Sequence, residues 1–118
     1  MIAKDRKTER IRRRKRIRAR ISGTSKRPRL SVFKSNKYLY VQLIDDDAQK
    51  TILSSSEFSL KGTAKKTREE RIKLLGQDIM KKAKAKKIGL IVFDRGGFPY
   101  TGNIKKLATL IREGGLIF

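Results

Sequence analysis

Apolar residues recur at different spacings along the chain, and the first regular spacing is every second residue. This alternation occurs in three short segments rich in β-branched and aromatic residues, separated by polar turns: Leu30–Phe33, Tyr38–Ile44 and Thr51–Ser54. Pro28, just before the first segment, suits the start of an extended stretch. Short connections between consecutive strands predict an antiparallel three-stranded meander.

The middle segment indicates which face of this meander is buried. Leu39, Val41 and Leu43 fall on one face of a strand, and Tyr38 and Tyr40 fall on the other. Because the first face is the more apolar, we expect it to belong to the core. The tyrosine face is then open to a ligand or covered by a helix.

Farther along the chain the period rises to that of a helix. Residues 63–87 are predicted to be helical, with one apolar face at Ile72, Leu75, Ile79 and Ala83. The run Leu90–Phe93 follows as a strand, which we expect to be buried on both faces. Asn103 is a suitable N-cap for a last helix, whose apolar stripe is Ile104, Leu107, Ala108 and Ile111.

These elements predict an α/β (α+β) fold. It contains a mixed sheet, made of the three-stranded meander and one further strand, flanked by two helices. The 118 residues suffice for one domain, and we expect a basic N-terminal arm at residues 1–21 and a single globular domain at 22–118.

Charge divides the chain more sharply than hydropathy does. The net charge is +21, and residues 1–20 hold eleven Lys or Arg against two acidic residues. Residues 10–20 contain eight cations in eleven positions, a density at which like charges repel one another unless a polyanion is bound. We expect this arm to be disordered, or a fraying helix, until it binds nucleic acid.

Composition excludes several classes of function. The chain has no Cys and no His, so it has no disulfide framework, no thiolate nucleophile and no histidine base. The apolar run at residues 88–93 is far too short to span a bilayer, and the arm lacks the apolar core of a secretory signal. The arm also has no apolar face with which to lie on a membrane surface.

Three segments carry residue types that contact RNA: the arm, the first predicted hairpin, and a glycine-containing loop after residue 93. Cations neutralise phosphates, hydroxyls contact phosphate or ribose, exposed aromatic rings stack on unpaired bases, and glycines allow close backbone approach. The candidate RNA-binding residues are Arg10, Arg12, Arg13, Arg14, Lys15, Arg16, Arg18, Arg20, Arg27, Arg29, Ser31, Lys34, Ser35, Asn36, Lys37, Tyr38, Tyr40, Arg95, Gly96, Gly97, Tyr100 and Gly102.

Other motifs have simpler interpretations. Asp45–Asp47 invites a metal site, but three adjacent carboxylates diverge on a strand and are typical of a turn. The segment Lys61–Thr67 lacks the glycine spacing of a phosphate-binding loop. Two alternative functions remain: another basic RNA-binding protein, or a small metal-dependent nuclease with Asp45–Asp47, Asp78 and Asp94 as the available carboxylates. Asp94 has a structural alternative as well, which is pairing with Arg95 or another neighbour.

The motifs together resemble a known family. The segments Ile21–Thr24, Arg27–Lys37 and Phe93–Gly97, followed by Tyr100, occur in the order and near the spacing found in ribosomal protein eighteen of the large subunit, in its bacterial form. The resemblance runs from about Arg12 to Phe118.

This resemblance implies a structural, non-enzymatic protein that needs no cofactor. Its expected partners are 5S rRNA, 23S rRNA and neighbouring large-subunit proteins. It would help attach 5S rRNA to 23S rRNA in the central protuberance of a cytoplasmic or organellar ribosome. The implied fold is related to the ribonuclease-H-like arrangement. The chain has Tyr38, Thr101 and Asn103 where the family commonly has His, His and Arg.

Overall fold

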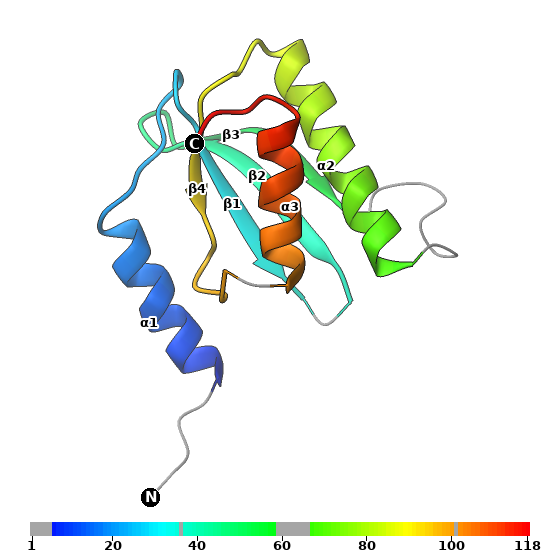
Figure 1. Ribbon diagram of the computed structural model, residues 1–118. Coiled ribbons are helices and arrows are strands. Elements are labelled where there is room, and N and C mark those ends of the chain that lie inside the picture. The colour runs from blue at the N-terminus through cyan, green and yellow to red at the C-terminus, as the bar shows by residue number, and fades with distance from the viewer. Residues whose placement is uncertain (1–5, 36, 59–66, 101) are drawn as a thin grey trace, which may run out of the picture.

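The computed structural model describes residues 6–35, 37–58, 67–100 and 102–118 of the chain. These residues form helices and strands in the order α1, β1, β2, β3, α2, β4, α3 (Figure 1). Their bounds are α1 Arg6–Arg18, β1 Arg29–Lys34, β2 Leu39–Asp45, β3 Lys50–Ser56, α2 Arg68–Ala85, β4 Val92–Asp94 and α3 Gly102–Glu113. The predicted α+β fold is confirmed.

The sheet has four strands in the order β3-β2-β1-β4. Strands β1 and β2 pair antiparallel, as do β2 and β3, whereas β4 joins β1 in parallel, so that Arg29 lies opposite Val92 and Ser31 opposite Asp94. A parallel partner needs a crossover connection, and α2 supplies it. The predicted meander plus one further strand is therefore correct.

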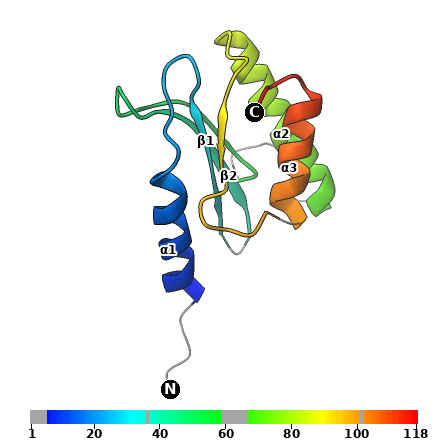
Figure 2. The same cartoon turned by 60° about the vertical axis from the view of Figure 1, so that its left-hand side comes forward.

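The core lies on one side of the sheet. Figure 2 shows α2 and α3 together on that side and α1 on the opposite side. Leu39, Val41 and Leu43 of β2 are fully buried there, next to Leu30 and Val32 of β1. This is the face of β2 that the alternating pattern predicts to be buried.

One prediction about the sheet is wrong. The segment Leu90–Phe93 is not a strand buried on both faces, because β4 begins only at Val92 and lies at the sheet edge. Leu90 is 44% exposed and forms an isolated bridge with Ile117, while Phe93 is half-buried and stacks on Phe118 with ring centroids 5.4 Å apart. An unbroken apolar run does not distinguish an edge strand of this kind from a central one.

The helix starts differ from expectation as well. Thr67 caps α2, since its hydroxyl accepts from the backbone N–H of Glu70. Asn103 is not the cap of α3, because the helix already includes Gly102. Most of the Lys61–Thr67 segment lies outside the described residues. Among the residues that the structure describes, no helix is long and apolar enough to cross a membrane.

Candidate nucleic-acid interface

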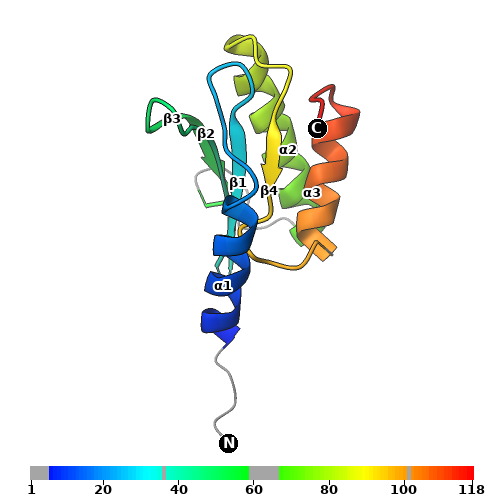
Figure 3. The ribbon, with the colours of Figure 1, turned by 90° about the vertical axis from the view of Figure 1, so that its left-hand side faces the viewer.

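The basic arm is a helix seated on the loop that follows β4. In Figure 3, α1 lies in front of the sheet at the lower ends of the adjacent strands β1 and β4 and extends past them. Arg13 Nε donates to the carbonyl of Gly97 at 2.8 Å, and the Arg10 guanidinium lies 4.9 Å from the ring centroid of Phe98. The arm and the glycine-containing loop, two of the three segments predicted to contact RNA, therefore form one surface although they are far apart in sequence.

Gly97 makes this close approach possible. Its φ is +83°, and a Cβ there would lie 2.3 Å from the carbonyl oxygen of Arg10. Gly96 has a φ of +65°, and a Cβ there would lie 2.3 Å from the carbonyl oxygen of Val32. Both glycines are buried, and the backbone that they admit is the protein's own. We therefore assign these two candidate RNA-binding positions to the seating of the loop on β1 and α1.

A buried carboxylate anchors the same loop to the sheet. Asp94 is fully buried and accepts from Arg29 Nη1 at 2.7 Å, from the Gly96 N–H at 2.8 Å and from Arg18 Nε at 3.4 Å. Arg95 instead donates to the carbonyl of Phe98 at 3.2 Å. Asp94 therefore pairs with Arg29 and Arg18 and not with Arg95. This is the structural pairing with a neighbour that the sequence offers as an alternative for Asp94.

Arg29 differs from the other candidate cations because it faces inward. It is only 7% exposed, and its Nε and Nη2 atoms donate to the two carboxylate oxygens of Asp46 at 3.0 Å each. The hydrogen bond with Asp46 raises the pKa of Arg29, and the same hydrogen bond lowers the pKa of Asp46. The Arg29 guanidinium is therefore engaged inside the protein by two carboxylates, unlike the exposed cations of the arm.

The remaining cations of the arm are accessible to different degrees. On α1 and just after it, Arg12, Lys15, Arg16, Arg18 and Arg20 are exposed, while Arg10, Arg13 and Arg14 are half-buried. Arg27, before β1, is exposed, and its Nε reaches the carbonyl of Ile91 at 3.3 Å.

The β1–β2 hairpin presents its polar residues around the turn. Lys34 and Lys37 are exposed, and Ser31 is half-buried. The Ser35 hydroxyl donates to the Tyr38 carbonyl and accepts from the Tyr38 N–H. The candidate residue Asn36 lies outside the described residues.

Aromatic rings on the hairpin lie on the side of the sheet away from α2 and α3. Tyr40 is half-buried against Phe33, with ring centroids 6.2 Å apart, and Phe33 is 46% exposed. Tyr38 packs instead on Phe58. Sequence reasoning did not select Phe33; its place two residues after Ser31, on the strand face opposite Val32, was the available signal.

The far end of the loop turns toward the C-terminus. Tyr100 is 37% exposed and packs edge-on against Phe93 with centroids 5.8 Å apart. Gly102, with a φ of +56°, begins α3 and is exposed. Both lie away from the contacts that join α1 to the loop.

The carboxylates of the nuclease alternative are all engaged by groups of the protein itself. Asp45 accepts from the backbone N–H groups of Asp47 and Ala48, as expected for a turn, and Asp46 accepts from the Gly23 N–H at 2.6 Å. Asp78 accepts from Ser55 and pairs with Lys82 at 3.0 Å. Asp46 and Asp94 are joined through the Arg29 guanidinium, whereas Asp78 is engaged by Ser55 and Lys82. Among the described residues, no three acidic side chains come together in a way that could hold a metal ion.

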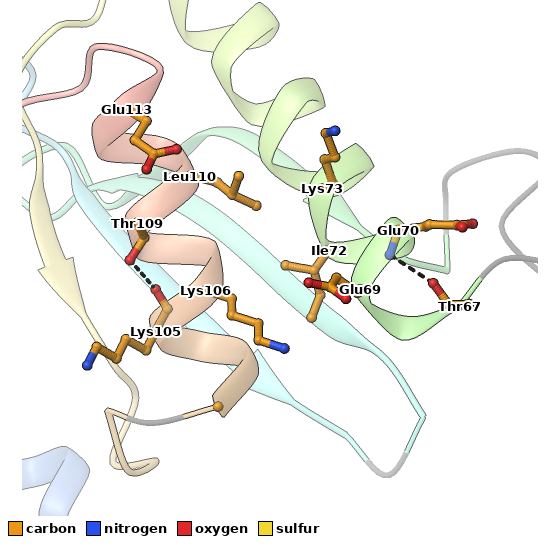
Figure 4. Close-up of a pocket in the computed structure, with 11 residues that line it drawn as sticks. Thr67, Glu69, Glu70, Ile72, Lys73, Lys105, Lys106, Thr109, Leu110 and Glu113 are labelled. Carbon is orange, nitrogen blue, oxygen red and sulfur yellow. Dashed lines mark hydrogen bonds between the residues drawn. The ribbon is translucent and has the colours of Figure 1, made fainter.

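A hollow lies between α2 and α3 (Figure 4), two helices that Figure 2 shows on the side of the sheet away from α1. Ile72 and Leu110 line it, and charges of both signs surround them, including Glu69, Lys73 and Lys106. Mixed charge of this kind attracts a polyanion less than the arm does.

Comparison with known proteins places this architecture in a family. Residues 4–118 match the family model described as ribosomal L18 of archaea, bacteria, mitochondria and chloroplast. The large ribosomal subunit protein uL18 of Lactobacillus delbrueckii subsp. bulgaricus is 46% identical over 119 residues, which covers 100% of both chains. That of Pseudothermotoga lettingae is 48% identical over 117 residues, with 97% of this chain and 96% of its own covered. That of Spiroplasma kunkelii is 44% identical over 116 residues, covering 98% and 96%. The chain therefore belongs to the ribosomal L18 family.

Proposed function

We propose that this protein binds 5S rRNA and helps attach it to 23S rRNA in the central protuberance of the large ribosomal subunit. Family membership makes the chain a structural constituent of that subunit and not an enzyme. The proposal adds the identity of the RNA partners, and it places neighbouring large-subunit proteins on the surfaces that RNA does not cover.

The observation that carries the proposal is the seating of α1 on the loop after β4. A helix with seven cations between residues 10 and 18 would bind any polyanion, because backbone charge holds no sequence information. Fixed to the loop through Arg13 and Gly97, the helix instead presents its charge in one orientation, next to the aromatic side of the hairpin. A surface of fixed shape supports recognition of one folded RNA.

Competition binding with the full chain tests this proposal. Labelled 5S rRNA is displaced by unlabelled 5S rRNA or by a duplex RNA of equal length at physiological salt. We expect 5S rRNA to bind tighter on the order of 10³-fold, the lower end for specific nucleic-acid complexes. Equal affinity for the two RNAs would show that the arm acts as a nonspecific polycation.

A second measurement addresses the attachment to 23S rRNA. Immobilised 5S rRNA should retain 23S rRNA only when the protein is present. Retention that is independent of the protein would remove the bridging part of the proposal and leave the 5S part intact.

A further inference from the structure

Four arginines from two distant segments surround one hollow on the surface. It has a volume of about 250 Å³, and its lining residues are Arg13, Arg16, Ile17, Arg20 and Arg95. Arg13, Arg16 and Arg20 are spaced by three and four residues, so they line one side of α1 and its C-terminal extension. Arg95 comes from the loop on which α1 is seated.

Two of these side chains are held in place by the protein. Arg13 Nε donates to the Gly97 carbonyl and Arg95 Nη1 to the Phe98 carbonyl. A guanidinium has five N–H donors, so both groups retain donors for a ligand. Arg13 and Arg95 are half-buried, whereas Arg16 and Arg20 are exposed. The hollow therefore has two fixed cations and two accessible ones.

The charge within the hollow is not balanced by its lining. No carboxylate lines it, and the nearby Asp94 is buried and engaged by Arg29 and Arg18. Like charges brought together in this way repel one another unless an anion lies between them. Guanidinium groups match the planar pairs of oxygens on a phosphate and bind them in bidentate fashion.

We propose that Arg13, Arg16, Arg20 and Arg95 form a pocket for one phosphate group of the RNA backbone. The inference rests on the proposed function, and it names the element of the surface that grips the RNA. Because the pocket needs both α1 and the loop, it exists only while α1 is seated. Phosphate binding and helix seating therefore stabilise each other.

Matched charge variants on the same helix test the pocket. Arg16→Gln/Arg20→Gln removes two exposed pocket cations, and Arg12→Gln/Lys15→Gln removes two exposed cations outside it. The pocket variant should lose roughly tenfold or more of its RNA affinity, as expected for charged hydrogen bonds. The control should lose about threefold or less, as expected for screened surface charge. Equal losses would overturn the pocket.

A second experiment needs no RNA. The Arg Nε–Hε signals of the full chain are followed by NMR as inorganic phosphate is added, with sodium chloride at equal ionic strength as the reference. The Arg13 and Arg95 signals should move with phosphate in the wild type and stay in place in Arg16→Gln/Arg20→Gln. Movement no larger than with chloride would overturn the inference. If phosphate binds here but 5S rRNA is not preferred over duplex, the proposed function fails and the pocket stands.

Gly97→Ala provides a variant that changes no charge. The added Cβ collides with the backbone of Arg10, so α1 should leave the loop and the pocket should open. We expect the Arg95 response to phosphate to disappear while circular dichroism still reports the folded sheet. An unchanged response would show that the pocket does not depend on the seating of α1.

Discussion

The carboxylate of Asp94 receives a hydrogen bond from Arg29 Nη1 at 2.7 Å, and both side chains are buried. Arg29 begins β1 and Asp94 ends β4, so this contact joins the two parallel strands. The same carboxylate also accepts from the Gly96 N–H and from Arg18 of the arm. One acidic group thus connects the sheet, the loop and the last turn of α1.

Replacing Asp94 should therefore destabilise the fold strongly. Asp94→Asn leaves the Arg29 guanidinium buried with one carboxylate in place of two, and breaking a buried pair costs about 3–5 kcal/mol. Urea unfolding at neutral pH measures the loss.

Arg18→Gln is the matched control for Asp94→Asn. It removes a partner of the same carboxylate, but the Arg18 side chain is 44% exposed, and such pairs contribute about 1 kcal/mol or less. If the two variants unfold at the same urea concentration, the buried Arg29–Asp94 contact is not the anchor that the geometry indicates.

The pairing of Arg29 with Asp46 should make stability depend on acid pH. The Arg29 hydrogen bond, followed by the backbone N–H of Gly23, holds the pKa of Asp46 below its usual value of 3.8. The folded state therefore binds this proton less readily than the unfolded state. The contribution of Asp46 is complete above its unfolded pKa and is lost as the pH falls through the folded pKa.

Asp46→Asn tests that dependence. Between pH 7 and pH 2 the melting temperature should fall less steeply for the variant than for the wild type. The slopes of the two curves should differ only below about pH 5, where the wild type loses the contribution of Asp46. Some dependence remains, because the pKa of Asp78 is lowered too: desolvation raises it, but the hydrogen bonds from Ser55 and Lys82 together with the charges of Lys82 and Lys81 lower it by more. Parallel profiles for the two proteins would contradict the assignment to Asp46.

Local patterns predicted the sheet well because its strands follow local rules. The alternation at Leu39, Val41 and Leu43 identified the buried face of β2, and the Asp45–Asp47 run identified a turn. In each case residues two or three apart determine the outcome. The buried faces of α2 and α3 followed from helical spacing in the same way.

Contacts between distant residues could not be read in this way. Arg13 and Gly97 are 84 positions apart, and no local pattern indicates that the arm lies on the loop. Arg29 looks like any other cation of the basic segment, because its burial depends on carboxylates 17 and 65 positions away. Gly96 and Gly97 were predicted to admit an RNA backbone, whereas in the structure the backbone beside them belongs to β1 and α1, which no local pattern indicates.

A second buried carboxylate, that of Glu57, should stabilise the first turn of α2. Glu57 is fully buried, its Oε1 lies 3.2 Å from Arg68 Nη2, its Oε2 lies 3.4 Å from Arg71 Nε, and it accepts from the Leu39 N–H at 2.7 Å. Glu57→Gln removes the negative charge between two arginines and should cost about 3–5 kcal/mol. Hydrogen exchange should accelerate first in the opening turns of α2.

Glu70→Gln controls for charge near the same helix end. Glu70 is exposed, and its side chain is absent from the ion pairs made by Glu57. It should change stability by about 0.5 kcal/mol or less. A comparable loss in both variants would indicate a general effect of the helix N-terminus and not the buried pairing.

The aromatic side of the hairpin provides a test that separates RNA stacking from packing. Phe33 is 46% exposed, beside Tyr40 and Phe98. An exposed ring that stacks on an unpaired base contributes about 1–3 kcal/mol. Phe33→Leu keeps an apolar side chain but removes the ring, so 5S rRNA affinity should fall by roughly 5- to 150-fold. Phe33→Tyr keeps the ring and should bind like the wild type.

Melting temperatures within a few degrees for both variants would establish that the fold is intact, since surface substitutions shift stability by about 0.5 kcal/mol or less. If Phe33→Leu binds as tightly as Phe33→Tyr, the ring serves only to pack against Phe98 and Arg10, and base stacking is not part of the interface.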